Sequence, residues 1–315
     1  MGNGWRALRR RILTPDVSET SLEKRGFHRK SPAAQERLET IGEKFLLGYA
    51  HAVEARSAEQ AEEWLERIPP QFRGFAYEGA GIGYGVLDGL PFGKSTNTAE
   101  FLAGPGEKHD YIIYVGVGWA MCRLPRFAWP KASAFDPLLR WLPYDGYGFH
   151  QAFFASGGAN LVHGPLKWAP YAHRAFHQGV GRALWFSCGA DPERIAAMTA
   201  IFPSVFATDL WSGVGLAATY AGGVPAGALA TLVSEAGAAA PALAQGAIAA
   251  TAARVTADNA NADTELACIE LCELSVDKAY ALYETALDGL EPHRDPMAYE
   301  TWRTRVQTYF QEAGR

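Results

Sequence analysis

The segment Trp211-Ser-Gly-Val-Gly215 carries the pattern that decides the fold, because the same pattern recurs along the chain. Each copy has an aromatic residue, one or two intervening residues and then Gly-x-Gly. The other copies are Phe75-Ala-Tyr-Glu-Gly-Ala-Gly81, Tyr114-Val-Gly-Val-Gly118, Tyr144-Asp-Gly-Tyr-Gly148 and Phe176-His-Gln-Gly-Val-Gly181. The first glycines of these five segments are 37, 30, 33 and 34 residues apart, and weaker copies at Gly48 and Gly246 extend the series by 31 and 33 residues.

Spacing of this length is typical of tandem helical hairpins, since one antiparallel helix pair with its two turns needs about 33 residues. Glycine inside a helix costs about 1 kcal/mol relative to alanine, so its recurrence requires a compensating gain. Two helix backbones approach closely where no side chain intervenes, and this contact supplies the gain. We therefore predict an all-α fold of tandem TPR-like hairpin repeats, arranged as an α-solenoid or a curled helical array. Strands or a phosphate-binding loop at the glycines are the alternatives.

Helix start signals support the helical prediction. Ser31 before Pro32 is a typical N-cap with proline in the first turn, and Ser57 precedes an acidic first turn. Asp136-Pro137 and Asp191-Pro192 are two further starts of the same kind.

No composition shift divides the chain into separate units, so we expect one continuous array with three regions. These are a basic, partly amphipathic segment at 1–30, a helical-repeat domain at 31–291 and a C-terminal capping helix at 292–315. The Gly/Pro/Ser-rich segments 91–108 and 157–170 are predicted to be long loops that carry binding surface.

The composition of the 315 residues, 48% hydrophobic and 20% charged, fits a globular protein with a sizeable core. A net charge of −5 argues against a nucleic-acid partner, which requires a broadly basic surface. The four cysteines are too few for a disulfide framework, so we expect structural thiols and a cytoplasmic location. The basic N-terminus lacks the apolar stretch of a signal peptide, and no run of about 18 apolar residues predicts a membrane span.

A polar residue directly precedes four of the five glycine pairs and also the single Gly246, and these polar residues are the main candidates for function. They are Glu78, Asp145, Gln178, Ser212 and, more weakly, Gln245. If the repeats superimpose, the five side chains form a row along one surface, next to aromatic residues at Tyr77, Tyr84, Tyr147, Trp185 and Trp211. Such a row is suited to line a groove for an extended, largely apolar ligand. The alternative is that the polar side chains bond to backbone carbonyls where glycine loosens the helix.

Histidines add a second group of candidates. His173 and His177 lie four residues apart, so they share one helix face, and His150 occupies a position that corresponds to His177 one repeat earlier. Metal binding, acid/base chemistry, and hydrogen bonding between repeats all fit this spacing. Because no zinc-protease pattern accompanies the histidines, we predict no metal. We name Glu78, Asp145, His150 and His177 as candidate catalytic residues. The candidate groove or partner-binding residues are Tyr77, Tyr147, Gln178, Trp185, Trp211 and Ser212.

No cofactor motif is present in the sequence. Residues 79–85 contain four glycines but do not meet the G-x-G-x-x-G spacing of a dinucleotide loop, and neither a P-loop nor a G-x-S-x-G elbow occurs. We therefore expect no cofactor. The segment Trp5–Leu13 alternates bulky apolar residues with arginines, a pattern that fits contact of residues 1–13 with an anionic membrane or an acidic partner. A solvated basic tail is the alternative.

Several longer segments together resemble one family. They include Phe72-Arg-Gly-Phe-Ala-Tyr-Glu-Gly79, Asp145-Gly-Tyr-Gly-Phe-His150, Phe176-His-Gln-Gly-Val-Gly-Arg-Ala-Leu-Trp-Phe186 and residues 209–223. The chain resembles the UnbL family of unknown-function proteins, which is found in actinomycete gene clusters for enediyne polyketides. The resemblance implies an iterative enediyne polyketide synthase, a thioesterase, a UnbU-type membrane protein and a UnbV-type repeat protein in the same cluster.

Two functions follow from the resemblance and the residues. We expect an accessory or co-catalytic subunit that helps convert a polyene into an enediyne core and docks with the membrane-associated UnbV-type and UnbU-type partners. This subunit would lie in the cytoplasm, with a peripheral contact at the inner face of the membrane. The alternative is an enzyme that acts directly on an apolar polyene in the groove described above.

Overall fold

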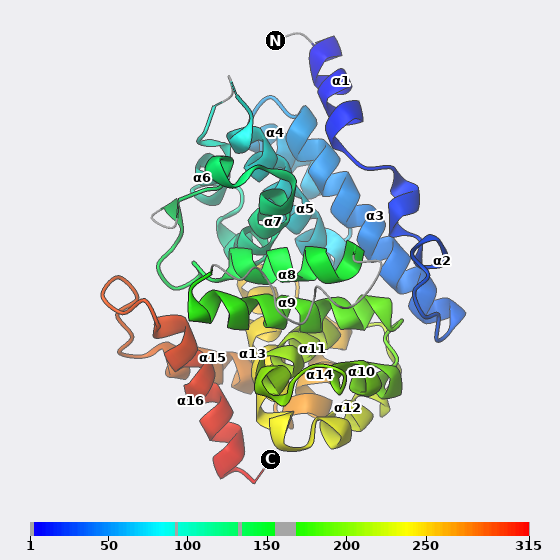
Figure 1. Cartoon of the computed structure of the whole chain (residues 1–315), viewed down its shortest axis with the longest axis vertical. Helices are drawn as coiled ribbons and strands as arrows, with labels where there is room; N and C mark the ends of the chain where they lie inside the picture. Colours follow the sequence, from blue (N-terminus) through cyan, green and yellow to red (C-terminus); the bar gives the residue numbers. More distant parts are fainter. Residues whose placement is uncertain (1–2, 92–93, 132–133, 155–167, 315) are drawn as a thin grey trace.

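The computed structural model describes residues 3–91, 94–131, 134–154 and 168–314, and it is helical, with no strand in any of these ranges. Seven long helices form a row that runs through the molecule (Figure 1). They are α3 (Pro32–Glu54), α5 (Pro70–Gly89), α7 (Asp110–Arg123), α8 (Leu142–Phe154), α9 (Pro170–Ser187), α11 (Ala207–Ala221) and α13 (Ala240–Thr256). Each of these central helices packs against the next one in chain order. The prediction of an all-α fold is confirmed.

Each central helix carries one of the seven glycine marks, and the glycines lie where two helix backbones meet. A Cβ atom placed on Gly179 would overlap the carbonyl oxygen of Asp145 on α8, and one on Gly181 would overlap that of Leu210 on α11. The two glycines of a pair therefore face opposite neighbours. The same alternation holds for the pairs Gly79/Gly81, Gly116/Gly118, Gly146/Gly148 and Gly213/Gly215. The expectation that glycines mark close helix contacts is confirmed, and the strand alternative is wrong.

The connections between central helices differ from one repeat to the next. Four of them contain a small helix: α4 (Ala58–Leu65), α6 (Asn97–Leu102), α10 (Pro192–Thr199) and α12 (Ala228–Ala236). Between α7 and α8 the described residues form only turns, among them a 3₁₀ turn at Arg126–Ala128. The repeat in this structure is thus one long helix plus a variable connection.

The two helix starts predicted from a serine N-cap, at Ser31 and Ser57, are confirmed. The side chain of Ser31 accepts a hydrogen bond from the backbone N–H of Ala34 at the start of α3, and Ser57 accepts one from Gln60 at the start of α4. Asp136 was expected to begin a helix, but its carboxylate instead accepts the N–H groups of Leu138 and Leu139 in a turn. The helix α8 begins six residues later, because the chain must first turn back toward α7.

Two more local predictions, the helix cap at Asp191 and the loop at 91–108, differ from the observed structure. Asp191 precedes α10 as expected, but its carboxylate binds His28 Nε2 at 3.1 Å and Lys30 Nζ at 3.4 Å instead of capping the helix. The segment 91–108 was expected to be a loop, yet it contains α6, whose Phe101 is fully buried beneath Tyr77 and Tyr84. Most of the second predicted loop, 157–167, lies outside the described residues.

The row of central helices curls, so helices far apart in sequence come into contact. The rings of Phe75 on α5 and Tyr220 on α11 lie 5.0 Å apart in an edge-on arrangement. Arg254 on α13 donates a hydrogen bond of 3.0 Å to the carbonyl of Gln71 on α5. Arg37 on α3 forms an ion pair of 2.9 Å with Asp263 at the start of α14 (Ala262–Ala267). These contacts close the interior on one side.

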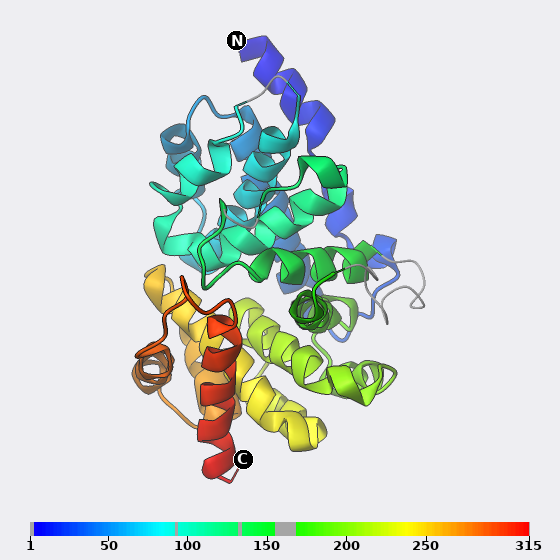
Figure 2. The ribbon, with the colours of Figure 1, turned by 60° about the vertical axis from the view of Figure 1, so that its left-hand side comes forward.

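The C-terminal helices lie against the last part of the row (Figure 2). The helix α15 (Val276–Leu287) follows a π-helical turn at Cys268–Cys272, and α16 (Ala298–Glu312) packs along α13 through Trp302, Val306 and Phe310. All four cysteines are free thiols, with Cys268 and Cys272 buried. Across the described residues, none of the helices combines the length and the apolar character required to cross a lipid bilayer.

A test of the glycine contacts uses Gly179→Ala. In an open helix this change would stabilise by up to about 1 kcal/mol, but here the new methyl group would overlap the carbonyl of Asp145. We expect a loss of about 1–3 kcal/mol or more in the free energy of unfolding, measured by urea denaturation. Gly4→Ala is the control, because a Cβ there meets no atom within 4 Å. Equal stability of Gly179→Ala and the unchanged protein would contradict the backbone contact.

Candidate functional site

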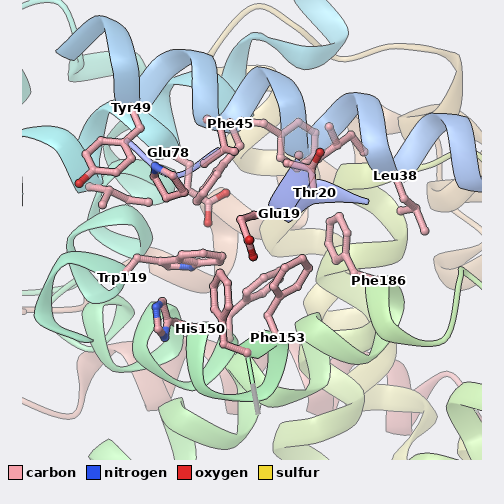
Figure 3. A pocket seen from close by; sticks show the side chains of 18 of the residues that line it. Glu19, Thr20, Leu38, Phe45, Tyr49, Glu78, Trp119, His150, Phe153 and Phe186 are labelled. Carbon is pink, nitrogen blue, oxygen red and sulfur yellow. The ribbon is translucent and has the colours of Figure 1, made fainter. Parts of the chain in front are cut away.

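A cavity lined mainly by aromatic and aliphatic side chains lies inside the first part of the helix row (Figure 3). Its volume is about 90 Å³. The helices α3, α5, α7, α8 and α9 form its wall, and residues 15–22, which precede α3, cover it. Its aromatic lining includes Phe45, Phe75, Trp119, Phe149, Phe153 and Phe186.

The aromatic rings of the lining pack on one another, which holds the cavity open. Trp119 is central, with its ring 4.7 Å from that of Phe45 and 5.3 Å from that of Phe149. Phe149 in turn lies 5.4 Å from Phe186. Aromatic pairs at these separations are favourable beyond their burial, so the rings form a rigid wall. A rigid aromatic wall is suited to a flat or extended apolar ligand.

Glu78 on α5 is the one acidic side chain that reaches the cavity from its interior side, among the described residues. The residue is only 3% exposed. Burial raises the pKa of the Glu78 carboxyl to about 7, and the charge of Asp145 adds to this effect, whereas Arg182 opposes it. A carboxyl with a pKa near neutrality is able both to hold a proton and to accept one, which is the requirement for an acid/base group.

Arg182 connects Glu78 to Asp145 inside the molecule. Its Nη1 donates a hydrogen bond of 2.7 Å to Asp145 Oδ1, and its Nη2 lies 3.5 Å from Glu78 Oε1. Asp145 also accepts a hydrogen bond of 2.7 Å from Gln178 Nε2. The guanidinium of Arg182 thus faces the carboxylates of both Asp145 and Glu78, and its contact with Asp145 is the shorter one. Glu78 is the carboxyl that remains weakly paired, which agrees with its raised pKa.

The row of polar residues continues from Gln178 toward α16. Ser212 Oγ lies 3.5 Å from Gln178 Oε1 and donates a hydrogen bond of 2.8 Å to Gln245 Oε1. The same oxygen of Gln245 accepts a hydrogen bond of 3.2 Å from Arg303 Nε on α16. Arg303 is completely buried and forms an ion pair of 3.0 Å with Asp209. All five residues that precede the glycine pairs are therefore linked into one buried polar row.

The glycine contacts explain why this row forms. The first glycine of a repeat packs on the carbonyl of the pre-glycine residue in the repeat before it. This holds for Gly116 on Glu78, Gly179 on Asp145, Gly213 on Gln178 and Gly246 on Ser212. Successive pre-glycine side chains are therefore brought next to one another. We expected this row on a surface of the array, but it lies in the interior, where the side chains bond to each other because no water is available.

The histidine candidates are separated by the structure. His150 lines the cavity beside Trp119, and its ring lies 4.6 Å from that of Phe154. Burial lowers the pKa of His150 to about 4, so its ring is neutral at pH 7. His177 is buried outside the cavity lining; its Nδ1 bonds to the carbonyl of His173 at 2.7 Å, and its ring stacks on Phe206 at 3.6 Å.

The aromatic candidates do not line a common groove. Tyr77 stacks on His109 at 3.8 Å and donates a hydrogen bond of 2.9 Å to Glu66. Tyr147 packs against Trp129 and Trp168. Trp185 and Trp211 are buried in the core. The actual cavity wall comes from residues that lie away from the glycine pairs, since positions such as Phe45, Trp119 and Phe153 face a different side of the helix row.

Arg182, Arg123 and most of the wall residues were not among the site residues predicted from the sequence. Arg182 follows Gly179-Val-Gly181 directly, and a charged residue so close to a buried glycine pair was a signal for a buried partner of Glu78 or Asp145. No signal marked Trp119 or Phe153. Among residues 3–91, 94–131, 134–154 and 168–314, no three His, Cys, Asp or Glu side chains come together in a way that would hold a metal ion.

Residues 4–310 match the model of a family described as Protein of unknown function (DUF1702). The chain belongs to this family. The match reaches from α1 to α16 in the described part of the chain, so the helix row, the cavity and the buried polar row are all parts of the DUF1702 unit. No curated protein matches the chain, and no solved structure does. Because the DUF1702 description assigns no chemistry, the site itself is the basis for a function.

The raised pKa of Glu78 predicts a specific pH dependence of stability. The neutral carboxyl is favoured in the folded protein, so its contribution is complete at low pH and is lost as the pH rises from about 4.5 to about 7. The loss is about 3 kcal/mol in the free energy of unfolding. Urea denaturation across this pH range should show the decline for the unchanged protein relative to Glu78→Gln. The exposed Glu43→Gln is the control, and a parallel pH profile for Glu78→Gln would disprove the shift.

Proposed function

We propose that this protein binds an elongated, apolar, conjugated chain in the aromatic cavity and exchanges protons with it through Glu78. The observation that carries the proposal is the meeting of an aromatic wall with a buried carboxyl whose pKa is about 7. Apolar walls with a few convergent polar groups are the usual form of small-molecule sites. A carboxyl with a strongly shifted pKa in such a site is a typical acid/base group.

The dimensions of the cavity support an extended ligand. Its wall follows α3 from Leu38 to Tyr49, a separation of eleven residues that spans about 16 Å of helix. Glu78 lies beside the middle of this length, near Phe45 (Figure 3). A chain that occupies the cavity would therefore present its central carbons to the carboxyl. The proton that Glu78 gives to one carbon is recovered from another, so the double bonds shift and the composition of the ligand is unchanged.

We place this chemistry in the maturation of a polyene into an enediyne core, as the resemblance to the UnbL family implies. In this proposal the protein is a co-catalytic subunit that works beside UnbV-type and UnbU-type membrane-associated proteins. Gln178 holds Asp145, Asp145 orients Arg182, and Arg182 positions Glu78. His177 does not line the cavity, so Glu78 and His150 are the polar residues assigned to the ligand.

The acid/base role is tested with Glu78→Gln. This change keeps the size of the side chain but removes the titratable proton. We expect the variant to bind a conjugated polyene with the same affinity as the unchanged protein, measured by the fluorescence of the polyene. When the variant replaces the natural protein in the producing cell, we expect no product to form. Leu46→Trp, which fills the cavity from its half-buried edge, should weaken binding at least tenfold. Full product formation by Glu78→Gln would leave a binding or docking subunit as the function.

A second candidate, a subunit that docks at a membrane surface, is supported by α1 (Asn3–Leu13). This helix projects from one end of the molecule (Figure 1). Arg9 and Arg10 attach it to the end of α3, through the carbonyl of Val53 and the carboxylate of Glu54. Trp5, Leu8 and Ile12 are 51%, 46% and 66% exposed. These three side chains share one face of α1, and the exposed Arg11 lies next to them, as in helices that bind anionic lipid surfaces.

This candidate predicts binding to anionic vesicles. We expect the protein to sediment with phosphatidylglycerol vesicles, less so at high salt, and the double variant Trp5→Ser/Ile12→Ser to lose most of this binding. Phe127→Ser removes an exposed aromatic side chain outside α1 and should bind normally. If the unchanged protein does not sediment with these vesicles, α1 does not serve as a membrane contact.

A further inference from the structure

The charges that line the cavity are compensated in its interior but not at its mouth. In the interior, Arg182 is held between Asp145 and Glu78. Glu19, on the covering segment, forms an ion pair of 2.6 Å with Lys24 and a second one with Arg25. Arg123 is the remaining charged residue of the lining. It has no carboxylate partner in the described part of the chain.

Arg123 lies where the cavity opens to solvent. It is the C-terminal residue of α7, and Arg123 and Phe154 are the two exposed residues of the lining. The guanidinium carbon of Arg123 lies 5.4 Å from the ring centre of Tyr49, a cation–π contact that leaves its N–H groups available. An arginine held over a ring at the mouth of an apolar cavity presents a fixed donor array to an anionic group.

The neutral ring of His150 provides a hydrogen-bond donor or acceptor near the end of the cavity where Arg123 lies. Figure 3 shows its ring next to Trp119, at the end of the cavity that Tyr49 marks, away from Leu38 and Phe186. Its Nδ1 atom is buried and has no hydrogen-bond partner in the described residues. A buried ring nitrogen without a partner is unfavourable unless a ligand supplies one. Trp119 Nε1 and Tyr49 Oη, at the same end, also lack hydrogen-bond partners, and Arg182 Nε beside Glu78 is a further such group in the lining.

We propose that the ligand is an anionic amphiphile, a long apolar chain that ends in a carboxylate, bound with its carboxylate at Arg123 and His150. This inference rests on the proposed function and specifies the substrate class and its orientation. The chain enters tail first, passes Glu78, and ends against Leu38 and Phe186. The reverse orientation would bury the carboxylate beside Glu78, where Arg182 is already neutralised, so repulsion and desolvation would both oppose it.

The experiment compares a conjugated polyenoic fatty acid with the alcohol of the same chain, using the polyene fluorescence to measure Kd. We expect the unchanged protein to bind the acid about tenfold more tightly than the alcohol at low salt, and Arg123→Gln to bind both with the affinity of the alcohol. Arg123→Lys should retain part of the preference because the charge remains. Arg126→Gln, which removes a neighbouring exposed arginine outside the cavity lining, is the matched control and should behave as the unchanged protein.

Two outcomes overturn the inference, and they are distinguishable. If the acid and the alcohol bind equally to the unchanged protein, or if Arg123→Gln keeps the preference for the acid, the carboxylate is not recognised at Arg123, while the cavity remains a site for apolar chains. If neither ligand binds, the proposed function fails together with the inference.

Discussion

The structure depends on the contact between helix backbones at the glycine pairs. At these points the carbonyl of one helix occupies the space that a side chain would need on the next. Neighbouring central helices are therefore fixed in register as well as in distance, because a shift by one residue would place a side chain in the contact. The dispersion energy of two closely packed backbones offsets the intrinsic cost of glycine in a helix.

Fixed register has a chemical consequence in the interior. It aligns the residues before each glycine pair, and it joins Glu78, Asp145, Gln178, Ser212 and Gln245 to two buried arginines. Such a network is stable only if its groups satisfy one another, since an unpaired charge in this environment is costly. The two carboxylates that share Arg182 are not paired equally. The less well paired of them, Glu78, holds its proton up to a pH of about 7 and lies at the edge of the aromatic cavity.

The cavity and the polar row have different origins. The row follows from the repeat, since equivalent positions in successive repeats lie side by side. The cavity follows from the curl of the array and from residues 15–22, which cover it, so its wall combines five helices and a segment outside the repeat. The proposed chemistry requires both parts: the cavity to hold an apolar chain, and the row to supply one titratable carboxyl in a water-poor environment.

The sequence by itself determined the all-helical fold, the recurring glycines on successive helices and the presence of a row of polar residues, because glycine spacing and the polar residues before the glycines are local features that repeat. It did not determine that the row is internal, that Arg182 neutralises Asp145 more fully than Glu78, or that Trp119, Phe153 and Arg123 meet at one cavity. Those results depend on how far the array curls and which faces then oppose one another. Contacts between repeats several steps apart, such as Phe75 with Tyr220, fix the curl, and no local pattern encodes them.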